Sequence, residues 1–402
     1  MNLNIADTLS QAHALKKANK IEEAIELLEK VNDKARHIDI VQTLANFLMD
    51  NNKYRRVTEI NNIRELDPRN YTIAKSLIDG DINNTTSIYL KSHAVLDKIA
   101  YISMIKDEED IIFFNLLWHY ALGLRKFFII NNLSGDRSLK FITLFEKIFQ
   151  DAEVFVLHDP VVAHFQGKKT TGACRFAMSL WSDLEWLVLA DADEFLYPTQ
   201  PLDVFFANVP KTTEAIILAK SFYNLWPDES AENNDYFFRR INHRTPITHV
   251  SAKILMRADI DFTVGQGNHH LFYKNGKKVQ HYFCDLSLTY REFRIRTFEQ
   301  QKNKFINFGK ALKAAKEQGF MQAGGINKEQ VYSLYLANGE SAIRKQFENN
   351  IQKAVKNTPI FDPLPLDRVI DSETSFLMAN EKAHSARLFK KVLAQLSSNS
   401  SK

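Results

Sequence analysis

Cysteine is scarce in this chain of 402 residues, which contains Cys174 and Cys284 and no others. Two cysteines cannot build a disulfide framework, and neither lies in a CxxC or Cys/His spacing typical of zinc sites. Long apolar runs are also lacking: no segment approaches the roughly 18 apolar residues of a membrane span, and MNLNIADTLS has no signal-peptide pattern. These absences predict no transmembrane segment and a reducing compartment, so we expect a cytoplasmic protein, or one held peripherally at the inner face of the membrane.

A strong charge of one sign is missing as well. Lys and Arg total 52 against 48 Asp and Glu, which gives a net charge of +4. This is far from the clustered basic surface of a nucleic-acid-binding protein, so nucleic acid is not an expected partner. The composition is 45% hydrophobic, 11% aromatic and 25% charged, as in folded globular proteins. At this length two or three domains are expected.

Helical periodicity dominates residues 1–70. Apolar residues recur at helical spacing in ALKKANKIEEAIELLEKV. A second segment, ANFLMDNNKYRRVTEINNIREL, aligns with the first and sets Ala12 opposite Ala45 and Ala24 opposite Val57, an offset of 33 residues in both cases (45 − 12 and 57 − 24). The offset is near the ~34-residue tetratricopeptide period, so the region resembles a degenerate pair of such units and offers a surface for a protein partner. A plain helical hairpin that caps the next domain would show the same periodicity.

A change of pattern follows the helical region. DPRN is interpreted as a helix stop, and the polar stretch containing GDINNTT predicts a linker over residues 71–96. Beyond it, the apolar runs KIAYISMI, KFFIINN, AEVFVLHD and EWLVLADADEF alternate with helical stretches. This alternation predicts an α/β fold in residues 97–285, with a mostly parallel sheet flanked by helices. Residues 286–402, which include YREFRIRTFEQQKNKFINFGKAL, are expected to be a helical C-terminal region.

Three carboxylates, Asp191, Asp193 and Glu194, directly follow the fourth apolar strand. Because crowded carboxylates repel one another and resist burial, a positive group is expected beside them. A divalent cation is the economical candidate, since Mg²⁺ and Mn²⁺ prefer carboxylate oxygens and leave positions for phosphate oxygens. Ligands of such sheets bind at the carboxyl ends of the strands, which favours a site over an acidic loop or a helix N-cap.

Several motifs occur in order: MIKDEEDIIFFNLLWHYALGLRKFFIINNLSGD, LADADEFLYP, GNHH, HYF and RTFEQQKNKF. Together they make residues 97–310 resemble the family-two-type glycosyltransferases of the GT-A (Rossmann-like) fold, more closely the bacterial branch with a D-x-D-E-F motif. The resemblance implies a hexosyltransferase-type enzyme that moves a sugar from a UDP- or GDP-sugar donor to an acceptor hydroxyl, with Mn²⁺ or Mg²⁺ as cofactor. The acceptor would be a glycan, a lipid-linked group or a protein, as in surface polysaccharide or glycan synthesis.

The resemblance also suggests roles for individual residues. The first two strand ends and the acidic motif would bind the nucleotide-sugar through Lys106, Asp107, Glu108, Asn132, Asp136 and Asp191. Asp191 and Asp193 would hold the metal, with His281 as the third ligand. His269 and His270 compete with His281 for that role, and the preceding glycines, Gly265 and Gly267, suit either a close approach to a ligand or a tight hairpin.

Charged residues elsewhere add further candidates. Basic side chains are candidates for contact with the diphosphate or the acceptor: Lys168, Lys169 and Arg175, around the expected third helix, and Arg291, Arg294 and Arg296, after the expected sheet. The alternative is a solvated helical face, which is usual for lysine and arginine. If the reaction inverts the anomeric centre, a carboxylate must deprotonate the acceptor hydroxyl. Asp228 and Glu229, on the polar segment after AIILAKS, are the candidates, with Asp228 preferred.

Two other functions stay open at this point. A nucleotidyltransferase shares the nucleotide-binding sheet and acidic metal ligands, but usually carries a Gly-rich basic turn where this chain has Met104 to Glu108. A non-catalytic helical-repeat interaction protein is disfavoured by the intact acids and His281. The sequence does not reveal the donor sugar, the acceptor, inversion or retention, or the oligomeric state, because specificity depends on loop geometry.

Overall fold

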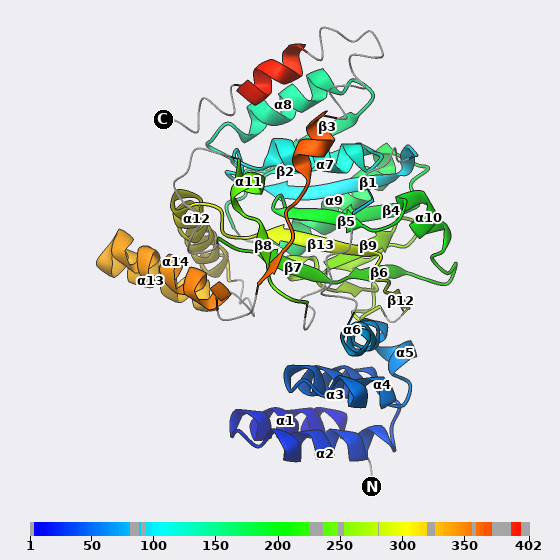
Figure 1. Ribbon diagram of the computed structural model, residues 1–402. Coiled ribbons are helices and arrows are strands. Elements are labelled where there is room, and N and C mark those ends of the chain that lie inside the picture. The colour runs from blue at the N-terminus through cyan, green and yellow to red at the C-terminus, as the bar shows by residue number, and fades with distance from the viewer. Residues whose placement is uncertain are drawn as a thin grey trace.

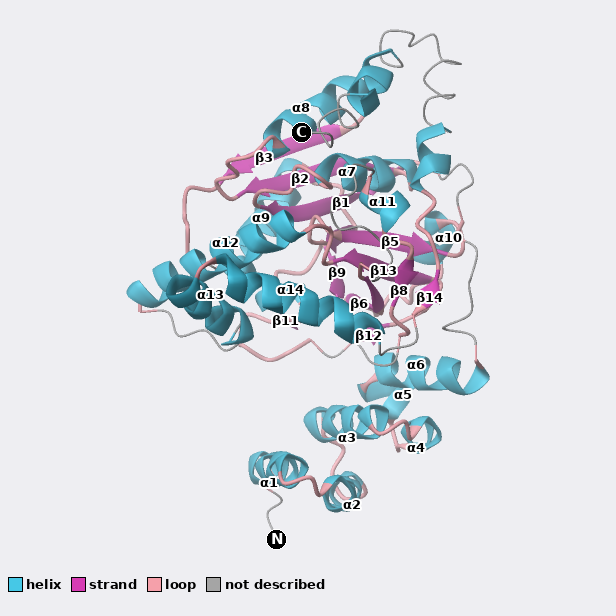
Figure 2. Cartoon of the chain, turned by 60° about the vertical axis from the view of Figure 1, so that its left-hand side comes forward, coloured by secondary structure: helices cyan, strands magenta, loops and turns pink. Residues whose placement is uncertain are grey.

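The computed structural model describes residues 4–80, 88–89, 94–163, 165–225, 236–247, 253–279, 281–319, 326–355, 359–371 and 387–394. These residues form a mixed α/β protein, as the sequence predicts. N-terminal helices lie at one end, two sheets with their covering helices form the body, and a second group of helices lies beside the sheets (Figures 1 and 2). Within the described ranges, every helix is too short or too polar to span a lipid bilayer.

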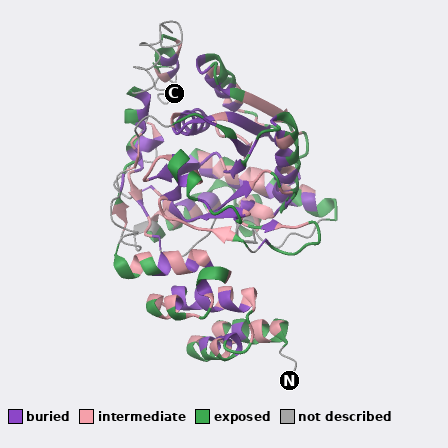
Figure 3. Ribbon diagram, turned by 90° about the vertical axis from the view of Figure 1, so that its right-hand side faces the viewer, coloured by how far each residue is buried: buried purple, intermediate pink, exposed green. Residues whose placement is uncertain are grey.

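The N-terminal module consists of helices that share one core. They are α1 (Ile5–Lys17), α2 (Ile21–Asn32), α3 (Ile38–Asp50), α4 (Tyr54–Glu59), α5 (Ile63–Leu66) and α6 (Pro68–Asp79). The positions aligned at the 33-residue offset, Ala12, Ala24, Ala45 and Val57, are all fully buried. Figure 3 shows that the N-terminal helices carry both buried and exposed residues. Ala219 of the sheet domain joins the same core, which attaches the module to the rest of the chain. The tetratricopeptide-like interpretation stays a prediction.

The segment expected as a linker, 71–96, begins as helix. DPRN ends α5, whose C-cap is Asp67, as the sequence predicts, and it also begins α6: Asp67 is the N-cap and accepts the Asn70 backbone N–H at 3.3 Å, and Pro68 is the first helical residue. Proline suits that position because its N–H would be unpaired there and its φ is already helical. The helix ends at Gly80, whose φ of 79° is left-handed. The same Asp-Pro pair therefore ends one helix and starts the next.

The main sheet has the strand order β12-β6-β9-β4-β1-β2-β3. Its strands are β1 (Leu96–Ile105), β2 (Leu124–Asn131), β3 (Glu153–His158), β4 (Trp186–Leu189), β6 (Ala215–Leu218), β9 (Lys253–Arg257) and β12 (Tyr282–Phe283). The four strands expected from the sequence are the parallel neighbours β4-β1-β2-β3. β9 runs antiparallel to both β4 and β6. The carboxyl ends of β1, β2, β3 and β4 therefore lie at one edge.

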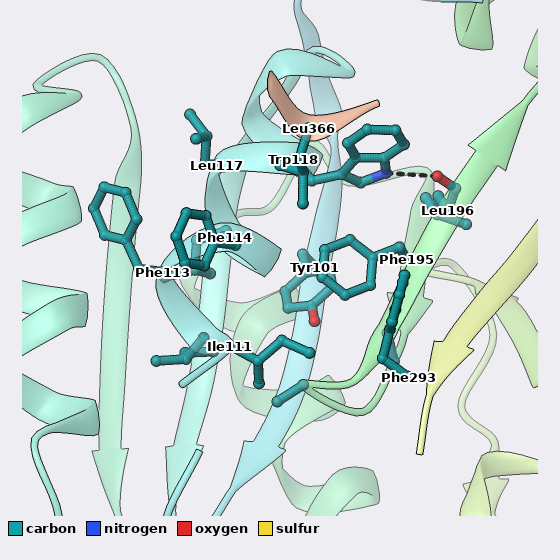
Figure 4. Close-up of a cluster of buried hydrophobic side chains, with 14 of the residues drawn as sticks. Tyr101, Ile111, Phe113, Phe114, Leu117, Trp118, Phe195, Leu196, Phe293 and Leu366 are labelled. Carbon is teal, nitrogen blue, oxygen red and sulfur yellow. Dashed lines mark hydrogen bonds between the residues drawn. The ribbon is translucent and has the colours of Figure 1, made fainter. Parts of the chain in front are cut away.

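Helices cover both faces of the main sheet. Connecting and neighbouring helices are α7 (Ile112–Ala121), α8 (Ser138–Ile148), α9 (Gln166–Leu180), α10 (Leu202–Ala207) and α11 (Phe237–Arg240). Successive residues of β1 point to opposite faces: Tyr101 contacts Asn115 and His119 of α7, whereas Ala100 and Ile102 share a core with α9. Figure 4 shows the α7 side, where the Trp118 indole N–H donates to the Leu196 carbonyl at 2.6 Å. This contact joins α7 to a second sheet.

The second sheet has the order β14-β8-β7-β13-β5. Its strands are β5 (Glu194–Pro198), β7 (Lys220–Tyr223), β8 (His243–Arg244), β13 (Leu288–Phe293) and β14 (Ile360–Phe361). β4 ends at Leu189 and β5 begins at Glu194, so the acidic motif is the connection between the two sheets. A short antiparallel pair, β10 (Thr263–Val264) and β11 (Leu271–Phe272), flanks the 3-10 turn Gln266–Asn268.

The expectation of helix from residue 286 onward is wrong for β13. All six residues of β13 are buried, and β5 and β7 pair with its two sides. Arg291 and Glu292 are charged yet buried, so the hydropathy of the β13 segment does not show that both faces of the strand are covered. Helices follow β13: α12 (Phe298–Glu317), α13 (Ile326–Asn338) and α14 (Glu340–Val355).

His119 on α7 is fully buried. Its Nδ1 lies 2.8 Å from the Asn115 carbonyl oxygen, and the Leu196 backbone N–H donates to its Nε2 at 3.4 Å. Burial lowers the pKa of His119 to about 4. An unfolded histidine titrates near pH 6.5, so at lower pH the unfolded chain binds a proton that the folded protein rejects. The contribution of neutral His119 to the free energy of unfolding is therefore complete above about pH 6.5, and it is lost as the pH falls toward about 4.

When the pH is lowered from about 7.5 to about 5.5, the free energy of unfolding is expected to fall in the wild type by about 1.4 kcal/mol more than in His119→Gln. The reason is that glutamine takes up no proton when the chain unfolds. Urea denaturation at the two pH values measures this difference. His13→Gln, at an exposed position of α1, is the control and should keep the wild-type loss. Equal losses in the wild type and His119→Gln would contradict a neutral buried His119.

Candidate functional site

A cavity of about 750 Å³ opens where β1 and β4 end. The loop after β1, the acidic connection, the 3-10 turn and the helices α12 to α14 contribute its wall. Residues predicted from separate sequence motifs line it together: Lys106, Asp107, Glu108, Asn132, Asp191 and Asp193. A cavity of several hundred Å³ at this edge of an α/β sheet is typical of a small-molecule site.

Two of the predicted binding residues point elsewhere. Asp136 supports a loop: its Oδ1 and Oδ2 accept the backbone N–H groups of Ser138 and Glu109, both at 2.9 Å. Arg175 lies on the outside of α9, where its Nε donates to Asp261 Oδ1 at 2.8 Å. Neither belongs to the cavity wall that the described residues form. The candidate bases Asp228 and Glu229 lie outside the described residues.

His281 lies near the opposite end of the main sheet. The residue after it, Tyr282, pairs with Ala215 of β6. Ala215 pairs in turn with Met256 of β9, and Met256 pairs with Leu187, near the start of β4. The acids follow the end of β4, about five residues or roughly 16 Å farther along the strand direction. His281 precedes a strand that runs parallel to β4, so it lies at the amino end, where it cannot reach Asp193. The structure therefore corrects the prediction of His281 as a metal ligand.

Of the competing histidines, His269 is part of the cavity wall. It follows Gly267, whose φ is 72°. A Cβ at that glycine would lie 2.6 Å from the His269 ring, so both the backbone conformation and the close contact require glycine. Gly265 and Gly267 lie in the turn that joins the antiparallel strands β10 and β11, as the tight-hairpin interpretation expects, and Gly267 also lines the cavity.

Lysine and arginine side chains from distant segments surround the acidic motif. One group, which we call the Lys253 network, links three acids to three bases: Asp191, Glu194, Glu292, Lys220, Lys253 and Arg294. Lys253 Nζ lies 2.7 Å from Asp191 Oδ2 and 3.2 Å from Glu194 Oε2. Lys220 Nζ lies 3.2 Å from Glu194 Oε1 and 2.6 Å from Glu292 Oε2. Each buried carboxylate of this network thus has a cation beside it.

A second group, the Arg296 network, surrounds the other acid of the motif. Lys304 Nζ, from α12, lies 2.7 Å from Asp193 Oδ2, and Arg296 Nη1 lies 3.9 Å from the same atom. Arg296 also pairs with Glu108 and with Asp110, the latter at 2.7 Å. Arg296 is fully buried and therefore depends on these acids to compensate its charge.

The balance between burial and these cations differs from acid to acid. Burial raises the pKa of Asp191, but Lys253 and Lys220 outweigh burial and hold the pKa below its usual value. For Glu194, burial outweighs the same two lysines and raises the pKa to about 7. For Glu108, burial outweighs Arg296 and Lys304 and also raises the pKa to about 7. Burial thus opposes ionisation of Glu194 and Glu108, and the neighbouring cations oppose burial.

Side-chain amides and two phenylalanines form the wall that faces the networks, which we call the amide wall: Gln300, Gln301, Asn303, Phe305, Asn307, Phe308, Gln346 and Asn350. Asn307 Nδ2 donates to Asp107 Oδ2 at 2.7 Å. The Oε1 atoms of Gln300 and Gln301 are buried without a hydrogen-bond partner. A buried acceptor left unpaired is costly, so these two atoms indicate where a ligand or a water molecule donates.

The carboxylates as arranged do not fit a divalent cation. Asp191 uses both oxygens: Gln166 Nε2 donates to Oδ1 at 3.0 Å, and Lys253 binds Oδ2. Asp193 faces Lys304 and Arg296. Across the described ranges, no group of three or more His, Cys, Asp or Glu side chains is placed to hold a metal ion. The positive group expected beside the acids is present as lysine and arginine.

Sequence reasoning missed Lys220 and Lys253 and the Glu292 that pairs with one of them. A usable signal existed for the two lysines, because each interrupts an otherwise apolar strand, AIILAKSFY and AKILMR. A buried lysine requires a paired acid. Lys304 gave no such signal, since it lies in a polar helical segment, QQKNKF, that resembles a solvent-exposed face.

Comparisons with known proteins found partial likenesses. No protein-family model matches the chain, and no curated protein matches it. Among solved structures, it is similar to S. aureus TarS, with 14% identity over 73% of this chain and 90% of that one and a TM-score of 0.30. It is also similar to the mannosyltransferase PcManGT from Pyrobaculum calidifontis, whose structure contains GDP-Man and Mn²⁺, with 11% identity over 90% and 99% of the two chains and a TM-score of 0.33. HddC from Yersinia pseudotuberculosis matches with 10% identity over 53% of this chain and 98% of that one, at a TM-score of 0.30. TM-scores this low define no correspondence between individual residues.

Lys253→Met is expected to cost about 3 kcal/mol of unfolding free energy, because methionine fills the space of a side chain that is 1% exposed but leaves Asp191 without its cation and Glu194 with Lys220 alone. Lys98→Met is the control, since its ion pair with Glu185 is solvent-exposed and should cost at most about 1 kcal/mol. Urea denaturation of both variants measures the difference. A cost for Lys253→Met no larger than the control's would show that the network does not hold the site together.

Proposed function

We propose that this protein is a nucleotide-sugar-dependent glycosyltransferase that moves a sugar from a UDP- or GDP-sugar to an acceptor hydroxyl, in the synthesis of surface polysaccharide or glycans. One observation carries the proposal: a single cavity at the carboxyl ends of β1 and β4 collects the polar turn after β1, the two aspartates of the acidic motif and a set of cations. The motif order in the sequence supports the same function.

The donor nucleotide is proposed to bind along the loop after β1. Asp107 has a φ of 54°, and its Oδ1 accepts the Gly135 N–H at 2.7 Å. Lys106 Nζ donates to the carbonyl oxygens of Asn132 and Leu133, at 3.2 and 2.8 Å. These bonds connect the ends of β1 and β2 and preform one side of the cavity, which lowers the cost of ordering the loop around a ligand.

The proposed reaction is a single displacement at the anomeric carbon of the donor sugar. The bond between the anomeric carbon and the β-phosphate oxygen breaks and leaves its electron pair on that oxygen. The acceptor oxygen forms the new bond to the anomeric carbon, and its proton passes to a carboxylate base, for which Asp228 and Glu229 stay the candidates. Cations at the cavity stabilise the charge that develops on the leaving diphosphate.

The amide wall is proposed to bind the acceptor. Side-chain amides both donate and accept hydrogen bonds, as sugar hydroxyls do, and the rings of Phe305 and Phe308 suit the apolar face of a sugar. The unpaired acceptors on Gln300 and Gln301 would receive hydroxyl protons. Mn²⁺ or Mg²⁺, which the sequence resemblance implies, has no fitting donor set among the described residues, so the displacement is written without it.

Wild-type protein is expected to release UDP or GDP from at least one donor among UDP-glucose, UDP-N-acetylglucosamine, UDP-galactose and GDP-mannose. Asp193→Asn should release it about 100-fold more slowly, because the amide keeps the shape but withdraws the charge that positions Lys304. Coupled assay of nucleotide release, with and without Mn²⁺, measures the rates. Circular dichroism checks that the variant is folded.

Asp183→Asn is the matched control, since Asp183 precedes β4 as Asp193 follows it, and its partner Lys126 binds it at the far end of the strand. The control should keep the wild-type rate. No nucleotide release from any of the four donors would contradict the proposal. Release of pyrophosphate from a nucleoside triphosphate and a sugar phosphate would instead indicate a nucleotidyltransferase.

A further inference from the structure

Charge at the site is already nearly balanced by the chain itself. The Lys253 network pairs three acids with three bases, and the Arg296 network pairs Asp193, Glu108 and Asp110 with Arg296 and Lys304. A divalent ion is attracted to carboxylates whose charge is uncompensated. These carboxylates have cations at hydrogen-bond distance, so an ion would have to displace lysine or arginine from them.

The cations of the site differ in how deeply their side chains are buried. Lys253 and Lys220 have side chains that are only 1% and 4% exposed, and each touches two acids. They lie on strands of the sheets, so they cannot withdraw and must stay paired with the acids. Arg294 and Lys304 also line the cavity, but their side chains are 49% and 31% exposed. The shallow pair is therefore accessible to a ligand.

Both shallow cations keep hydrogen-bond donors beyond the acids that orient them. Asp193 holds Lys304 at 2.7 Å, and an ammonium has three N–H donors. Glu292 holds Arg294 through Nε at 3.1 Å, and a guanidinium has further N–H groups in a fork that fits phosphate oxygens. The acids thus fix the two cations in place at the cavity, as a protein holds a metal in place by its ligands.

We propose that Lys304 and Arg294 bind the diphosphate of the donor directly, in the position that a divalent cation takes in a metal-dependent enzyme. This inference rests on the proposed glycosyltransferase function. When the bond to the anomeric carbon breaks, the electron pair stays on the β-phosphate oxygen, and the ammonium and guanidinium N–H groups stabilise it there by hydrogen bonding. The two residues neither take up nor release a proton in this step.

Calorimetric titration with UDP and with GDP, in EDTA and then in Mn²⁺, tests the inference without requiring the acceptor. We expect at least one of the two to bind in EDTA with a Kd within about tenfold of the Kd in Mn²⁺. Lys304→Gln and Arg294→Gln should each raise the Kd in EDTA at least about tenfold, because each removes charged hydrogen bonds. Thermal unfolding of the unliganded variants checks that they are folded.

Lys302→Gln is the matched control on the same helix, because Lys302 pairs with Glu299 and Glu340 and is not among the lining residues. It should keep the wild-type Kd. Binding that appears only with Mn²⁺, or an unchanged Kd in both Lys304→Gln and Arg294→Gln, overturns the inference while the glycosyltransferase proposal stands. Absence of binding to UDP and GDP under both conditions counts against both proposals.

Discussion

The pairing of buried carboxylates with lysine and arginine is the interaction on which the rest of the site depends. Asp191, Asp193 and Glu194 occupy the connection between the main sheet and the second sheet, where burial alone would force them to take up protons or to move apart. Their partners come from β9, β7, the segment after β13 and α12. The same ion pairs that make burial tolerable therefore hold the two sheets together at the edge where the cavity opens.

Much of the α/β body could be predicted because its signals are local. The apolar runs of β1, β2, β3 and β4 and the helices between them show their periodicity within a few residues, and the acidic motif is contiguous. β13 could not be predicted in this way, because its burial depends on strands far away in the sequence. The prediction of His281 as a metal ligand was wrong for a related reason, because the distance between His281 and Asp193 depends on strand direction, which no local pattern encodes.

The nature of the positive group beside the acids illustrates the same limit. The sequence shows that the three acids lie close together, since all of them belong to one segment. It does not show which opposite charges come from elsewhere, and Lys220, Lys253 and Lys304 are each supplied by a different element. A metal ion was the simplest inference from the acids alone, whereas the fold supplies the charge from within the chain.

The amide wall and the loop after β1 belong to different parts of the chain, one to the C-terminal helices and the other to the main sheet. On the proposed function, the side that holds the donor and the side that meets the acceptor can therefore change separately. Exchange of Asn303, Gln346 or Asn350 would alter which hydroxyl-bearing molecule is accepted, with the charged groups left in place. Because the two sides are separate, the C-terminal helices are the place where substitutions would redirect the proposed activity toward a new acceptor.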